Sequence, residues 1–230
     1  MSCHAPHTKK MEIREFDDPR IASGMGWIVC GSSGSGKSTF IKNLILHSDY
    51  VLQKKPTCYI YVYCLWENHF LELEQAGVRF FKGFDHEELQ NLEAFRGGMI
   101  VYDDCVEQLQ DPLFLRNMFC KYTHHLDLHA VCVVHHMYSK TIPHFREICL
   151  NAQITVFLSS PRAIDAICTW ARQVFARSSP QFISLYKEIC KEPHQYLLTY
   201  LAPANPNILR VRSKIFPFEQ PTEIYALEEK

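Results

Sequence analysis

The sequence predicts an α/β fold, built on a mostly parallel sheet that is covered by helices. Three observations lead to this prediction. Short apolar runs of strand length alternate with segments of helical character along most of the 230 residues. Hydrophobic residues make up 47% of the chain, which is enough to fill a sizeable core. A glycine-rich loop joins the first of the apolar runs to a helical segment.

The apolar runs of this pattern give the expected strands. They are short, rich in Val, Ile and aromatic residues, and bounded by turn-forming residues. In chain order they cover residues 25–30, 57–65, 78–81, 99–102, 130–134, 154–158, 196–201 and 208–215. A turn rich in Pro and Asn joins the last two runs, which predicts a closing antiparallel pair at the C-terminal end.

The expected helices fill the intervals between these strands. They cover residues 37–47, 70–75, 85–95, 112–122, 143–149, 162–175 and 181–190. Local residues mark some of their ends, since Pro112 suits a first helical turn and Gly97 follows the third helix. Residues 1–24 are polar and mixed in charge, so we expect an irregular lead-in there and a single domain over residues 25–230.

The composition argues against several classes of protein. No apolar run approaches the ~20 residues of a membrane helix, and the N-terminal segment lacks the apolar stretch of a secretory signal. The ten cysteines are scattered singly, which favours reduced thiols in an intracellular protein. The net charge of −1 argues against a protein that coats DNA, although residues 116–230 carry 13 Lys and Arg against 9 Asp and Glu. That basic half could contact a polyanion, and a solvated basic face explains it equally well.

Residues 31–38 read Gly-Ser-Ser-Gly-Ser-Gly-Lys-Ser and match the phosphate-binding loop, or Walker A motif, GxxxxGK[ST]. The glycines let backbone N–H groups approach phosphate oxygens, and the following helix presents its positive end to the anion. Lys37 can reach the β- and γ-phosphates of ATP, and the Ser38 hydroxyl can bind Mg²⁺. The residues expected to bind ATP are Gly31, Ser32, Ser33, Gly34, Ser35, Gly36, Lys37, Ser38 and Thr39.

The apolar run over residues 99–102 ends in two carboxylates, Asp103 and Asp104. An acid at this position in a P-loop enzyme holds Mg²⁺, and a second acid can act as the general base that activates water. We assign Asp103 to Mg²⁺ and Asp104 to the water. The strand expected over residues 57–65 lies between the two motifs along the chain. This position indicates the class of P-loop NTPase whose sheet has an extra strand between two others. These are the strand before the phosphate loop (the Walker A strand) and the strand that ends in the acidic pair (the Walker B strand).

The strand expected over residues 130–134 ends at His135. In motor ATPases a polar residue at such a strand end senses the γ-phosphate, so His135 is a candidate to contact that phosphate or the attacking water. A structural or surface histidine is an equally good interpretation of this residue. The sequence has no NKxD motif and no LSGGQ motif, which argues against a GTPase and a transporter-type ATPase.

The order of these motifs resembles that of the genome-packaging ATPases of double-stranded DNA viruses in the FtsK–HerA superfamily. The likeness is to the poxvirus and polinton type, with similarity to the adenovirus packaging ATPase, and it covers residues 25–225. The segments that carry it are residues 31–39, 100–105, 123–125, 131–138, 146–152, 159–162 and 196–201. The chain departs from the superfamily at His135, where Gln is usual.

The resemblance implies a homo-oligomeric ring that pulls double-stranded DNA into a viral capsid, with the capsid or its portal vertex as a partner. It implies a location in the host nucleus, in a cytoplasmic virus factory or in the virion. In such a ring a neighbouring subunit supplies an arginine to the γ-phosphate. Arg146 is the first candidate and Arg162 the second, although either could be an arginine of a surface ion pair.

Two other functions remain open from the sequence. The first is a nucleoside or nucleotide kinase, in which Arg162, Arg172 and Arg177 would form a lid over the phosphates. The two adjacent aspartates argue against it, because a kinase must avoid activating water. The second is a DNA-binding or capsid-binding module that binds nucleotide without hydrolysing it. The intact phosphate loop and acidic pair argue against that function.

Overall fold

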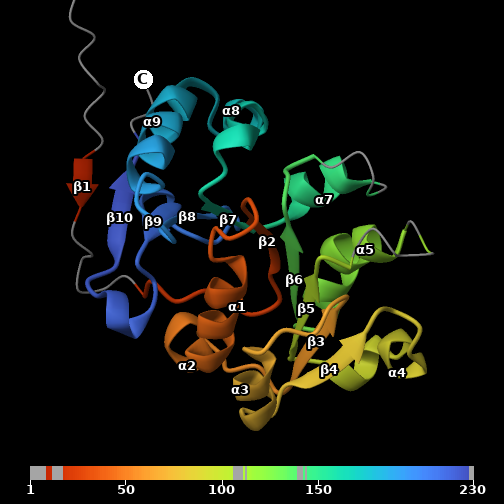
Figure 1. Ribbon diagram of the computed structural model, residues 1–230. Helices are drawn as coiled ribbons and strands as arrows, with labels where there is room; N and C mark the ends of the chain where they lie inside the picture. The colour runs from red at the N-terminus through yellow and green to blue at the C-terminus, as the bar shows by residue number, and fades with distance from the viewer. Residues whose placement is uncertain are drawn as a thin grey trace, which may run out of the picture.

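Among the described residues, ten strands form one sheet, in the order β1-β10-β9-β8-β7-β2-β6-β5-β3-β4 (Figure 1). The computed structural model describes residues 9–11, 18–105, 111, 113–138, 142 and 144–227. The strands are β1 Lys9–Met11, β2 Gly26–Cys30, β3 Tyr59–Tyr63, β4 Arg79–Lys82, β5 Met99–Asp103, β6 His129–Val134, β7 Ile154–Leu158, β8 Tyr196–Tyr200, β9 Val211–Ser213 and β10 Glu223–Ala226.

The pairing of these strands confirms the predicted sheet. All pairs from β4 through β3, β5, β6 and β2 to β7 are parallel, and β8 pairs antiparallel with β7 and β9. The sheet continues beyond the predicted C-terminal pair, because β10 joins β9 and β1 joins β10, both antiparallel. The segment expected to be an irregular lead-in therefore contributes the strand β1, and residues 1–8 and 12–17 of that segment lie outside the described residues.

The extra strand between the two nucleotide motifs is β6. It pairs with β2, which precedes the phosphate loop, and with β5, which carries the acidic pair. The strand that lies between the motifs along the chain, β3, is found on the other side of β5. The class of sheet was thus predicted correctly, and the strand that occupies the inserted position comes from later in the chain.

Helices follow the strands in the predicted alternation, several of them shorter than expected. They are α1 Lys37–Leu46, α2 Ser48–Val51, α3 Phe70–Gln75, α4 Glu87–Gln90, α5 Phe114–Asn117, α6 Thr123–His125, α7 Phe145–Asn151, α8 Ile164–Phe175 and α9 Ser179–Ile189. A π-helical turn over Met118–Tyr122 connects α5 to α6, and the helix expected over residues 85–95 divides into α4 and a 3₁₀ turn, Leu92–Phe95. The helix starts predicted at residues 112 and 143 lie outside the described residues.

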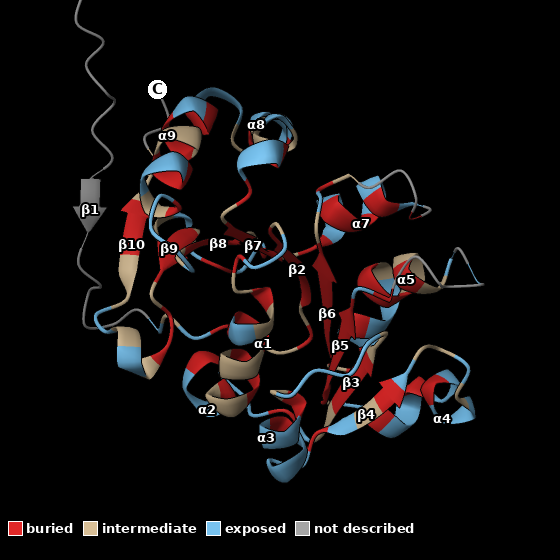
Figure 2. Cartoon of the chain, viewed as in Figure 1, coloured by how far each residue is buried: buried red, intermediate tan, exposed pale blue. Residues whose placement is uncertain are grey.

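The helices cover both faces of the sheet, as Figure 2 shows by the buried strands between partly exposed helices. Successive residues of a strand point to opposite faces, so neighbours in β2 belong to different cores. Val29 packs in the core that α1, α2 and α3 close, whereas Ile28 packs in the core under α5, α7, α8 and α9. Within the described residues, no helix has the length and hydropathy to cross a membrane.

Candidate nucleotide-binding site

The phosphate loop lies at the edge of the sheet where β2, β5, β6 and β7 end. Parallel strands end at one edge, so the residues that follow them meet there. The N–H of Gly31 donates to the carbonyl of Val134 at the end of β6, over 3.2 Å. The N–H and hydroxyl of Ser32 both donate to the carbonyl of Ser159 beyond β7, over 3.3 and 2.9 Å. The loop is therefore attached to both neighbours of β2.

The glycines of the loop are required by its shape. A Cβ on Gly31 would lie 2.4 Å from Ser35 Oγ and 2.9 Å from the Cβ of Leu158, closer than atoms can pack. Gly36 caps α1 with φ of +101°, a left-handed backbone that favours glycine. The Ser35 hydroxyl is buried inside this turn without a hydrogen-bond partner among the described residues. The loop is thus a polar concave turn that leads into the N-terminal end of a ten-residue helix.

The side chain of Lys37 is folded against this loop and is 7% exposed. Its Nζ donates to the carbonyls of Gly31, at 2.9 Å, and Ser32, at 3.2 Å, and lies 3.2 Å from Nδ1 of His135. Burial lowers the pKa of the Lys37 ammonium, and the charge of Asp104 acts in the opposite direction. A buried cation beside unpaired helix N–H groups is an arrangement that binds phosphate.

Asp103 is the last residue of β5 and is 9% exposed. The Tyr61 hydroxyl on β3 donates to its Oδ2 over 2.6 Å. Burial raises the pKa of Asp103 to about 6, and the bond from Tyr61 partly opposes that rise. Tyr61 did not appear among the sequence candidates, because only the pairing of β3 with β5 brings it under the carboxylate.

Asp104 and His135 form the exposed side of the site. Asp104 has φ of +49°, and its Oδ2 lies 2.9 Å from Nε2 of His135. An ammonium group can only donate, so Nδ1 of His135 accepts from Lys37 and Nε2–H donates to Asp104. The three side chains form one hydrogen-bonded chain, Lys37–His135–Asp104. The structure therefore brings together the loop lysine, both acids and the histidine that the sequence singled out.

The two candidate arginines have different positions. Arg146 lies exposed on α7, and no hydrogen bond or ion pair joins it to another described residue. Arg162 lies in the 3₁₀ turn Pro161–Ala163, three residues after Ser159, whose carbonyl holds the loop. Both arginines are exposed, Arg162 close in the chain to the residue that holds the phosphate loop and Arg146 on α7.

The donor set fits a magnesium ion that is held mainly by water and substrate. In the described part of the chain, no group of three or more His, Cys, Asp or Glu residues could hold a metal ion. Mg²⁺ in nucleotide sites commonly has one or two protein ligands and completes its octahedron with waters and phosphate oxygens. The partly buried hydroxyl of Ser38 and the carboxylate of Asp103 provide oxygen ligands of this kind.

We expect Asp103→Asn to be more stable than the wild-type protein above pH 6 in the absence of Mg²⁺. The raised pKa of Asp103 means that the ionised carboxylate disfavours the folded state. The stabilising contribution of the protonated carboxyl is fully present below about pH 4 and is lost as the pH rises through about 6. The advantage of the variant should reach about 1–3 kcal/mol at pH 8 and shrink at pH 4.5. Urea unfolding of both proteins at the two pH values measures it. A pH-independent difference would contradict this account of the carboxyl.

Comparison with known proteins supports the fold. No protein-family model and no curated protein sequence matches the chain. Among solved structures, B204, the DNA-packaging ATPase from Sulfolobus Turreted Icosahedral Virus, is similar over 90% of this chain and 99% of that chain, with a TM-score of 0.51 and 10% identity. The genome packaging NTPase B204 from Sulfolobus turreted icosahedral virus 2, in complex with ATP-gammaS, is 11% identical over 90% and 98% of the chains (TM-score 0.48). A KaiC-like protein from Pyrococcus horikoshii OT3 is 10% identical over 83% and 85% (TM-score 0.46). The likeness to B204 from Sulfolobus Turreted Icosahedral Virus, with its TM-score of 0.51, shows that the chain has the fold of a P-loop NTPase.

Proposed function

We propose that this protein is an ATP-hydrolysing motor that translocates double-stranded viral DNA into a capsid during virion assembly. The observation that carries the proposal is the meeting of three groups at one sheet edge. These are a phosphate loop with a buried lysine, a buried acid at the end of β5, and an exposed acid bonded to His135 on β6. The resemblance of the motif order to viral packaging ATPases supports the motor and the poxvirus and polinton type.

In this proposal the residues of the site divide the work of hydrolysis. Lys37 and the loop N–H groups bind the triphosphate, and Ser38 and Asp103 hold Mg²⁺, which neutralises charge on the phosphate oxygens when it is bound. Asp104 orients the attacking water and accepts its proton. His135 holds Asp104 through Nε2–H and loses the donor at Nδ1 when Lys37 turns to a phosphate. The histidine thereby couples occupancy of the loop to the position of Asp104.

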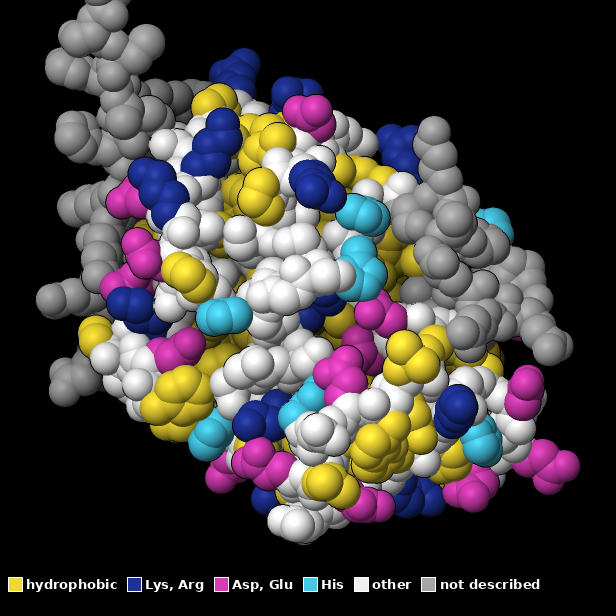
Figure 3. All heavy atoms as spheres, in the orientation of Figure 1, with side chains coloured by type: hydrophobic (Ala, Val, Ile, Leu, Met, Phe, Trp, Pro, Cys, Tyr) yellow, Lys and Arg dark blue, Asp and Glu magenta, His cyan; other side chains and the backbone are white. Residues whose placement is uncertain are grey.

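A basic surface supports DNA as the polymer that is moved. Lys and Arg side chains gather over α8 and α9 on the face in Figure 3. The exposed basic residues of this region are Arg162, Arg172, Arg177, Lys187 and Lys191. They belong to the C-terminal half, whose positive balance contrasts with the near-zero charge of the chain. In a ring, only the surface that lines the pore has to contact phosphates, so a small overall charge is compatible with DNA binding.

The role proposed here includes partners and a location. The homo-oligomeric ring would dock on the capsid or its portal vertex. It would work in the host nucleus or a cytoplasmic virus factory and could remain with the virion. A nucleotide kinase is the second candidate, and Asp104 argues against it, because a carboxylate bonded to a histidine near the loop would direct water to the γ-phosphate.

The test is the ATPase rate of the purified protein with and without duplex DNA, together with its oligomeric state by light scattering. We expect a ring-sized particle and a rate that duplex DNA increases several-fold. Lys37→Ala should lower ATP affinity and turnover by about 10²-fold or more, because it removes the buried cation of the loop.

Lys42→Ala is the matched control for that variant. Lys42 lies on the same helix, α1, and pairs with Glu72 at 3.0 Å, away from the loop. The Lys42→Ala protein should bind and hydrolyse ATP at the wild-type level. A folded Lys37→Ala protein with unchanged turnover would refute the site. A monomer that transfers phosphate to nucleoside monophosphates, with no response to DNA, would refute the motor in favour of a kinase.

A further inference from the structure

The order of the strands gives the bound nucleotide a direction. From β2, the acids on β5 lie two strands to one side, and β8 lies two strands to the other. The Lys37–His135–Asp104 chain marks the side on which the terminal phosphate reacts. This direction rests on the proposed function, in which Asp104 orients the attacking water. If the phosphates point toward β6 and β5, the nucleoside must leave the loop toward β7 and β8.

His194 lies on that side, two residues before β8. Its backbone has φ of +64°, and its side chain packs directly on the loop. A Cβ added to Gly36 would lie 3.0 Å from Nδ1 of His194 and 3.4 Å from its Cβ. The residue is exposed, and neither ring nitrogen bonds to another described residue. An aromatic ring is thus held at the N-terminal end of α1, in an unusual backbone conformation, without a partner of its own.

A pocket of about 320 Å³ opens on the same side of the loop. Residues 159–161, which follow β7, line it together with Tyr186, Lys187 and Lys191. Ser160 is 2% exposed, and its Oγ has no hydrogen-bond partner among the described residues. Its neighbour Ser159 accepts both bonds from Ser32 of the phosphate loop. The pocket therefore adjoins the loop, and one of its lining residues carries a buried hydroxyl without a partner among the described residues.

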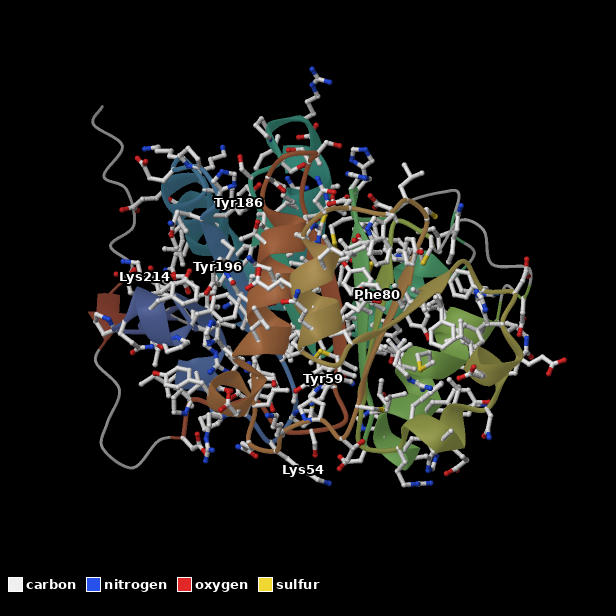
Figure 4. All side chains as sticks on the ribbon, turned by 60° about the horizontal axis from the view of Figure 1, so that its bottom comes forward. Lys54, Tyr59, Phe80, Tyr186, Tyr196 and Lys214 are labelled. Atoms are coloured by element: carbon white, nitrogen blue, oxygen red, sulfur yellow. The ribbon has the colours of Figure 1, made fainter. Side chains whose placement is uncertain are left out.

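Other contacts hold this pocket in place. The Tyr186 hydroxyl donates to the carbonyl of Leu158 over 3.1 Å and accepts from the N–H of Ser160 over 3.0 Å. Figure 4 shows Tyr186 and Tyr196 on one side of α1 and Phe80, of the distant strand β4, on the other. The pocket thus has a fixed wall on the β7 and β8 side, away from the catalytic acids.

We propose that His194 and the pocket of Ser160 form the nucleoside end of the site. The base stacks on the imidazole of His194, and the polar edge of the nucleoside faces the Ser160 hydroxyl. The described lining of the pocket contains no carboxylate and no side-chain amide. A hydroxyl both donates and accepts, so it serves adenine and guanine alike. The site therefore takes ATP and GTP with little discrimination between the two bases.

The expected results separate the nucleoside from the phosphates. Calorimetric titration in the presence of Mg²⁺ gives the affinities for ATP, GTP and inorganic tripolyphosphate. The wild-type protein should bind ATP and GTP within about tenfold of each other, since large discrimination requires hydrogen bonds to the base edge. His194→Ala should weaken both nucleotides by about tenfold, as expected for a lost stacking partner, and leave tripolyphosphate unchanged.

Matched variants guard against a simple loss of structure. His194→Gly also removes the ring, suits the positive φ and should reproduce the effect, whereas His194→Phe keeps a stacking face and should retain nucleotide affinity. Ser160→Ala should weaken both nucleotides less than His194→Ala does. His125→Ala is the control, since His125 is exposed on α6, which precedes β6 at the opposite edge of the sheet.

Several outcomes would overturn the proposal. Unchanged ATP affinity in both His194→Ala and His194→Gly would show that His194 does not stack on the base. An equal loss of ATP and tripolyphosphate would mean that His194 only supports the loop. A preference for ATP over GTP above about 10³-fold would show that the base edge is read by hydrogen bonds. A wild-type protein that binds neither ATP nor tripolyphosphate would instead refute the proposed function itself.

Discussion

A mixture of Arg146→Ala and Lys37→Ala subunits is expected to hydrolyse ATP faster than either variant alone. Arg146 projects from α7 without a partner among the described residues, and we propose that it enters the site of the adjacent subunit in a ring. Arginines in this role contribute on the order of 10³–10⁵ in rate. Arg146→Ala alone should therefore bind ATP normally and hydrolyse it slowly. In mixed rings some sites combine an intact lysine from one chain with an intact arginine from its neighbour.

The measurement is steady-state ATPase across mixing ratios, with duplex DNA present to favour assembly. Arg146→Ala mixed with the double variant Lys37→Ala/Arg146→Ala is the control, because no site in that mixture has an intact arginine. The particles must be shown to contain both variants. If their activity never exceeds the weighted sum of the two parent activities, Arg146 does not act in the site of the adjacent subunit. Arg162 would then be tested in the same way. A lid arginine of a monomeric kinase acts within its own chain and gives no rescue in any mixture.

Asp104→Asn is expected to bind Mg·ATP at the wild-type level and to lose hydrolysis by about 10²–10⁴-fold, the usual contribution of a general base. Asn keeps an oxygen that can accept the bond from His135 Nε2–H, so the local geometry should survive. It cannot take a proton from water. Single-turnover hydrolysis, measured beside ATP affinity, separates the two effects. A wild-type rate in this variant would mean that the base lies elsewhere.

Asp103→Asn provides the comparison within the same pair of acids. Asp103 is buried and bonded to Tyr61, whereas Asp104 is exposed and bonded to His135. We therefore expect Asp103→Asn to require more Mg²⁺ for both ATP binding and hydrolysis, whereas Asp104→Asn should leave the Mg²⁺ requirement unchanged. The same Mg²⁺ titration of both variants tests the division of roles.

The sequence determined the parts of this protein that depend on local patterns. The phosphate loop was readable because glycine, lysine and serine at fixed spacing are needed for one backbone conformation, which Gly31 and Gly36 show. The parallel strands were readable because their apolar runs are buried on both faces. The position of the acidic pair at the end of β5 followed directly. The strand β1, at one edge of the sheet, and its neighbour β10 were not predicted, because Lys9–Met11 and Glu223–Ala226 lack the long apolar runs that marked the buried strands.

Only the tertiary structure decided which residues meet. The pairing of strands places β6 between β2 and β5, and this brings His135 to Lys37 across 98 positions of the chain. It also brings Tyr61 to Asp103 across 42 positions, and the loop before β8 carries His194 onto Gly36. Strand order depends on the summed packing of all helices on both faces of the sheet, which no local pattern encodes. The sequence by itself therefore determined that the chain has a phosphate loop and an acidic pair, whereas the fold decided which side chains surround them.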